Sequence, residues 1–126
     1  MAKIFLSIAG ILGGLAVAAG AFGSHALREK LSDRSLEIFE TGVRYQMYHA
    51  LALLLVALLI SQTNNPTTPL IVAGCLFIAG IVIFSGSLYA LSLTGIKYFG
   101  AITPLGGVAF IAAWLTLALA PWSLKS

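Results

Sequence analysis

The side chains best able to do chemistry gather in residues 44–49 (RYQMYH), where a long apolar run begins. Tyr45 and His49 are four residues apart, so they share one face of a helix. A histidine that titrates near neutral pH suits a proton relay. With His25, the other histidine of the chain, His49 could also supply two nitrogen ligands to a haem.

No pattern in the sequence indicates catalysis. Ser24 and His25 are neighbours, but a serine nucleophile needs its base within hydrogen-bond reach in space, and no Asp or Cys is placed to orient His25. A P-loop, a Rossmann fingerprint and an HExxH motif are all missing, and the single cysteine, Cys75, lies in an apolar run. We predict no catalytic residue, no metal and no cofactor, and we expect the protein not to be an enzyme.

The composition indicates an integral membrane protein. Of 126 residues, 60% are hydrophobic and only 9% are charged, whereas soluble domains carry about 25% charged residues. Seven basic and four acidic side chains are too few to cover a small soluble domain. The high hydrophobicity excludes a disordered chain, and a net charge of +3 without a basic run argues against nucleic acid as a partner.

Four apolar runs predict four membrane-spanning helices. Lipid offers the backbone no hydrogen-bond partners, so spanning segments are helices or closed barrels, and long continuous apolar runs indicate helices. About 20 residues cross a hydrocarbon core of roughly 30 Å. We expect one transmembrane domain over residues 1–126, an all-α four-helix bundle with spans at residues 4–22, 43–60, 70–91 and 101–120.

The connection between the first two spans differs from the others in its charge. Residues 25–41 hold seven of the eleven charged side chains, and Leu36, Phe39 and Val43 recur at helical spacing. We predict a short interfacial amphipathic helix here, with a bend near Gly42 where it meets the second span. The basic side chains favour the cytoplasm for this loop.

Four spans gather most polar side chains at one end of the bundle, opposite the two termini. The candidate polar cluster there comprises His25, Glu40, Arg44, Tyr45, Gln46, Tyr48, His49, Ser85, Ser87, Tyr89 and Thr103. A charge in the membrane needs a partner. We therefore expect an ion pair of Arg44 with Glu40 or Glu37, and a position of His25 from which it could face His49.

Three interpretations of this cluster stay open. It could be a structural plug that locks the helix ends together, a transport or proton-relay path, or a cofactor site such as a haem between the first two spans. The structural interpretation is favoured, because polar groups in a membrane must be satisfied whatever the function.

The first span is rich in small residues, and Gly10 and Gly14 form a GxxxG pair. Helix backbones approach each other closely at such faces. We interpret the pair mainly as packing inside one bundle, with a contact between chains as the alternative.

Four motifs in order resemble one family. They are residues 20–25 (GAFGSH), 41–51 (TGVRYQMYHAL), 84–89 (FSGSLY) and 102–107 (ITPLGG). In these motifs the chain is similar to the domain-of-unknown-function 423 family, small bacterial inner-membrane proteins related to the eukaryotic transmembrane protein 256 group. The resemblance implies about four spans and no established activity.

We therefore predict a small multi-pass protein of the bacterial inner membrane with a structural or accessory role. The lipid bilayer surrounds it, and its partners would be further copies in a homo-oligomer or the other subunits of a larger membrane complex. The alternative is a small transporter or channel that uses the polar cluster.

Overall fold

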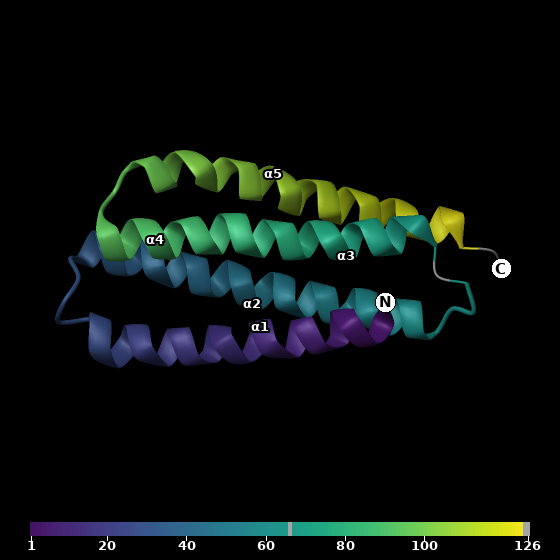
Figure 1. Ribbon diagram of the computed structural model, residues 1–126, viewed down its shortest axis with the longest axis horizontal. Helices are drawn as coiled ribbons and strands as arrows, with labels where there is room; N and C mark the ends of the chain where they lie inside the picture. The colour runs from purple at the N-terminus through teal and green to yellow at the C-terminus, as the bar shows by residue number, and fades with distance from the viewer. Residues whose placement is uncertain (66, 125–126) are drawn as a thin grey trace.

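The computed structural model describes residues 1–65 and 67–124, which form four long antiparallel helical rods (Figure 1). Short π-helical turns extend the first rod and interrupt the third, and a 3-10 turn ends the fourth. In chain order the elements are α1 (Ala2–Phe22), η1 (Gly23–Leu27), α2 (Asp33–Ser61), α3 (Thr68–Gly80), η2 (Ile81–Ser85), α4 (Gly86–Thr94), α5 (Tyr98–Leu119) and η3 (Ala120–Ser123).

The four rods confirm the predicted all-α membrane fold. Residues 1–65 and 67–124 contain no strand, and each rod is long and apolar enough to cross a membrane. Each apolar run recognised in the sequence lies inside one rod, because a backbone without water as a partner satisfies its hydrogen bonds within a helix.

The short interfacial helix is not confirmed as an element of its own, because α2 runs without a break from Asp33 to Ser61. The Ser32 hydroxyl caps its start by accepting a hydrogen bond from the Ser35 N–H at 3.1 Å. The amphipathic pattern itself is real, but its apolar side contacts protein. Phe39 is buried, and its ring lies 5.1 Å from the ring of Tyr89 in α4.

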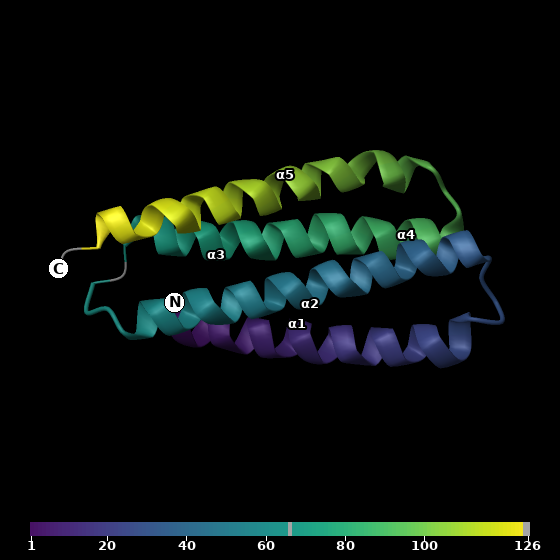
Figure 2. The ribbon, with the colours of Figure 1, turned by 180° about the vertical axis from the view of Figure 1, so that it is seen from behind.

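The rods follow one another across the molecule in chain order. Figures 1 and 2 show α1 and α5 at opposite edges, with α2 and the α3–η2–α4 rod between them, and each rod packs against the next. We call the end that holds the start of α1 and the α2–α3 connection side A, and the end that holds η1 side B. The two edge helices consequently expose most of their surface.

The apolar core lies mainly between α2, α3 and α5, where Leu53, Leu70 and Phe77 have almost no exposed surface. Helix α1 joins this core through Phe5, whose ring fills the space that a side chain at Gly74 of α3 would occupy. The glycine therefore sets how closely α1 and α3 approach on side A.

Candidate functional site

Polar side chains inside the bundle link the helices to one another. Those that are buried among the described residues are Gln46, His49, Ser85, Ser87 and Ser92. All of them make hydrogen bonds, four of the five to another helix, and the fifth, Ser92, to the Tyr89 carbonyl one turn before it.

Gln46 of α2 connects three helices. Its side-chain Nε2 donates to the Leu12 carbonyl of α1 at 2.8 Å, and its Oε1 accepts from the Tyr89 hydroxyl of α4 at 2.7 Å. A helix carbonyl has a second lone pair, so Leu12 can accept this bond in addition to its helical one. The amide thus ties α1 and α4 to α2 at the level of the middle of the first span.

Two serines link the third rod to its neighbours. The Ser85 hydroxyl donates to the Gly42 carbonyl of α2 at 2.7 Å, and the hydroxyls of Ser87 and Thr103 lie 2.6 Å apart, joining α4 to α5. Gly42 is needed at this approach, because an added Cβ would lie 2.8 Å from the Tyr89 ring.

His49 is held by both of its ring nitrogens. Nδ1 lies 2.7 Å from the Tyr45 carbonyl, one turn earlier in α2, and the indole Nε1–H of Trp114 donates to Nε2 at 3.1 Å. A carbonyl only accepts and an indole only donates. This hydrogen-bond network assigns the proton to Nδ1 and makes the imidazole a neutral acceptor at Nε2.

Aromatic rings surround the imidazole of His49, which is only 5% exposed. The ring of Phe110 stacks on it at 3.6 Å between centroids and 8° between planes, and Phe77 lies at 5.7 Å. His49 is therefore packed as one ring of an aromatic layer between α2, α3 and α5.

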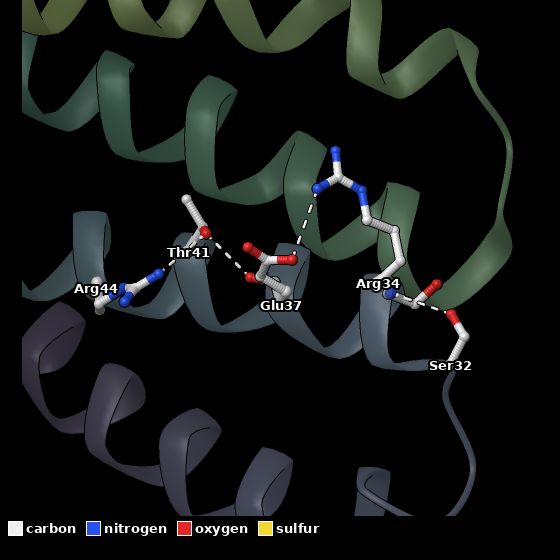
Figure 3. Close-up of polar contacts among 6 residues, drawn as sticks. Ser32, Arg34, Glu37, Thr41 and Arg44 are labelled. Atoms are coloured by element: carbon white, nitrogen blue, oxygen red, sulfur yellow. Dashed lines mark hydrogen bonds and ion pairs between the residues drawn. The ribbon is translucent and has the colours of Figure 1, made fainter.

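The charged side chains lie on the outside of the bundle. Arg34 pairs with Glu37 at 3.6 Å, and the Arg44 guanidinium donates to the Thr41 hydroxyl at 3.3 Å (Figure 3). The prediction that Arg44 forms an ion pair with Glu40 or Glu37 is wrong, because neither carboxylate lies within ion-pair distance of its guanidinium in the described chain. Thr41 is only three residues before Arg44 on the same side of α2, and the carboxylate of Glu37 is turned toward Arg34.

The two histidines do not meet. His25 lies in η1 and is exposed, whereas the ring of His49 faces Phe110 and Trp114 of α5. Within residues 1–65 and 67–124, no three or more His, Cys, Asp or Glu side chains come together as a metal site.

The comparisons with known proteins agree with this architecture. Residues 19–107 match the family described as "Protein of unknown function (DUF423)". The chain belongs to this family. It is 51% identical to the UPF0382 membrane protein YwdK of Bacillus subtilis, over 94% of this chain and 95% of that protein. A UPF0382 membrane protein of Staphylococcus epidermidis is 48% identical over 94% of each chain. No solved structure matches the chain.

DUF423 membership and the four apolar helices make the chain a small membrane protein with bacterial relatives. Its predicted polar cluster divides into two parts in the structure. The inner polar set, joined by hydrogen bonds between helices, is Gln46, His49, Ser85, Ser87, Tyr89 and Thr103. The outer polar set, exposed on the bundle, is His25, Glu40, Arg44, Tyr45 and Tyr48.

Trp114 is a member of the hydrogen-bond network that the sequence analysis missed. It lies within a span, 65 residues after its partner His49. A signal was present, because a tryptophan N–H in an apolar environment needs an acceptor. Only the depth of both residues in their spans could have suggested the pair.

Three glycines of α1, Gly10, Gly13 and Gly14, do not pack against a neighbouring helix as expected. An added Cβ at Gly10, Gly13 or Gly14 would meet nothing within 4 Å, whereas one at Gly23 would lie 3.0 Å from the Phe39 ring. The interpretation of the Gly10–Gly14 pair as close packing within one bundle is wrong, because no neighbouring helix comes within 4 Å of the Cβ position of either glycine.

Proposed function

We propose that this chain is a structural subunit of the bacterial inner membrane that associates with other membrane helices and has neither enzymatic nor transport activity. The inner polar set carries this proposal. Its polar groups are engaged in hydrogen bonds between helices, as expected for a bundle with a fixed shape.

A proton relay would require groups that take up and release protons in turn. Both nitrogens of His49 are engaged, one by a backbone carbonyl and one by an indole N–H, and neither partner is an acid or a base in this range. The ionisable side chains of Glu40 and Arg44 lie on the outer surface of α2. This arrangement supports a structural role for the polar cluster.

The exposed edges of the bundle support a role in association. Helix α1 contacts the bundle mainly through α2, and its glycines at positions 10, 13 and 14 leave open space at the surface. In lipid, helices associate through close packing of small residues and through polar contacts. A rigid bundle with such an edge suits a subunit of an assembly.

Reconstitution into liposomes tests the absence of transport. We expect proton and potassium flux equal to that of protein-free vesicles, both for the unmodified chain and for His49→Ala, while an added ionophore verifies that the vesicles report leakage. Flux above the protein-free level that disappears in His49→Ala would overturn the proposal.

Chemical cross-linking in native membranes, followed by purification in mild detergent, tests association. We expect the chain in a product larger than one copy. A chain that stays a lone monomer at every cross-linker concentration contradicts the structural-subunit role.

A further inference from the structure

We propose that a second copy of this chain docks on the face formed by α1 and α2, giving a symmetric dimer whose two-fold axis runs along the membrane normal. This inference rests on the proposed function and names the partner that the exposed edge takes.

The docking face contains an open apolar groove of about 230 Å³ between α1 and α2. Its walls are Leu6, Ala9, Gly10 and Gly13 from α1, with Met47, Ala50, Leu51 and Leu54 from α2. The glycines leave room for the side chains of an incoming helix, because nothing lies within 4 Å of a Cβ built on either of them. Lipid-facing helices pack closely at such small-residue positions.

The same face of α2 carries a continuous seam. Its residues recur at alternating intervals of four and three, namely Glu40, Arg44, Met47, Leu51 and Leu54. This interval places one residue per turn on a line along the helix, the pattern by which two helices pack side by side at a small crossing angle. The groove-lining residues of α2 are thus continuous with two charged residues toward side B.

Arg44 lies at a depth where it needs a partner. The Val43 side chain reaches within 3.5 Å of the Cβ position of Gly20. The adjacent Arg44 therefore lies within the depth of the apolar run 4–22, close to the end of that run on side B. Its guanidinium turns toward side B and reaches Thr41 (Figure 3). The described chain gives it a hydroxyl but no carboxylate, and a charge in a span is expensive without one.

The seam is self-complementary in charge. A two-fold axis along the membrane normal puts equal residue numbers at equal depths in the two copies. Because the Arg44 guanidinium reaches Thr41, the neighbour of Glu40 in α2, it lies at the same depth in the membrane as the carboxylate of the partner's Glu40. Each copy supplies one cation and one carboxylate, so two ion pairs form across the interface.

An anionic lipid is the competing occupant. Its phosphate would suit Arg44 but would be repelled by Glu40, which is exposed on the same side of α2. A second copy accommodates both charges and also fills the apolar groove below them, so the observations favour it.

Disulfide cross-linking in membranes tests the position of the interface. In a Cys75→Ala background, Leu51→Cys introduces a thiol on the seam and Leu115→Cys introduces one on the outer face of α5. The two leucines are 52% and 62% exposed, and the contact between His49 and Trp114 puts them at nearly the same depth. We expect a disulfide-linked dimer for Leu51→Cys only. A monomer, or equal dimer from both variants, overturns the proposal.

Charge exchange tests the ion pairs. Arg44→Glu makes both charged seam positions acidic and Glu40→Arg makes both basic, so each variant alone should lose dimer by about tenfold or more, since facing like charges cost several kcal/mol. Co-expressed with different tags, the two variants should form a mixed dimer at close to the unmodified yield. Loss without recovery in the mixture points to anionic lipid and overturns the second copy.

The outcomes separate this inference from the proposed function. The second copy is refuted if Leu51→Cys gives no disulfide-linked dimer. The structural role still stands in that case if the liposomes show no His49-dependent flux and the chain is found cross-linked to another protein. His49-dependent flux refutes the structural role whatever the cross-linking shows.

Discussion

At Gly106, helix α5 lies directly against the backbone of η2, and this contact makes a sharp prediction. A Cβ built at Gly106 would lie 2.7 Å from both the Cα and the Cβ of Phe84. Carbon atoms in packed interiors stay about 3.5–4.0 Å apart, so Gly106→Ala must push the two helices apart by roughly 1 Å. At the next residue, a Cβ on Gly107 would lie 4.0 Å from the Phe84 ring, an ordinary contact.

The two alanine variants differ in packing but share the gain in helix propensity, which is about 0.8–1.0 kcal/mol for alanine over glycine. Gly107→Ala should therefore be neutral or stabilising by up to about 1 kcal/mol. Forcing extra atoms into a packed interior costs about 1–3 kcal/mol. Gly106→Ala should be less stable than Gly107→Ala by about this amount, which is roughly 5- to 150-fold in the unfolding equilibrium.

Reversible unfolding in mixed micelles with increasing sodium dodecyl sulfate measures this difference. The fluorescence of Trp114 reports on it, because the indole lies beside His49 and the ring of Phe77. We expect the midpoint of Gly106→Ala to fall below that of Gly107→Ala. Equal midpoints for the two neighbours would falsify the inference that the Gly106–Phe84 approach limits the spacing of α5 and η2.

Other predictions concern single interactions. Gln46→Leu should lower the free energy of unfolding by about 1–3 kcal/mol and Tyr89→Phe by about 0.6, since hydrogen bonds between membrane helices average about 0.6 kcal/mol and reach about 1.7. In the Gln46→Leu background, Tyr89→Phe should cost nothing further, and an additive cost would exclude their coupling. Trp114→Phe should lower the stability by about 0.6 kcal/mol and should not alter it in His49→Phe, with unfolding followed by circular dichroism because this variant lacks the fluorescent reporter. A reporter active only outside the cytoplasm, fused after Ser126, should be active if the loop at 25–41 is cytoplasmic, and silence would reverse the orientation.

The helices themselves could be predicted, because a segment with apolar side chains has few other structures in lipid that satisfy its backbone N–H and C=O groups. The runs at 4–22 and 101–120 needed no knowledge of their neighbours. The amphipathic segment did, since its apolar side fits a membrane surface and a protein surface equally well. The contacts of the Phe39 ring with Tyr89 and with the backbone at Gly23 show that this side faces protein, and neither contact is visible in local spacing.

The polar cluster could be located from the sequence but not resolved into its partners. Spacing allowed Arg44 to reach several groups on the same side of α2, and it could not tell that Thr41 is the one contacted. The link from Gln46 to α1 uses the backbone carbonyl of Leu12, which no side-chain pattern marks. Contacts of this kind depend on the rotation of each helix about its axis, a quantity that apolar periodicity fixes only loosely when nearly every residue is apolar.

Helix α2 combines two kinds of polar residue that follow different physical rules. On its inner side, the hydrogen bonds of Gln46 and His49 are strengthened because lipid and apolar side chains offer no competing partners. These bonds to α1, α4 and α5 fix the rotation of α2 about its own axis. On its outer side, Arg44 and Glu40 contribute no ion pair within the described bundle. Since the inner bonds already fix which side of α2 faces outward, they also fix where those two charges stand, and a partner copy would meet the same arrangement in every molecule.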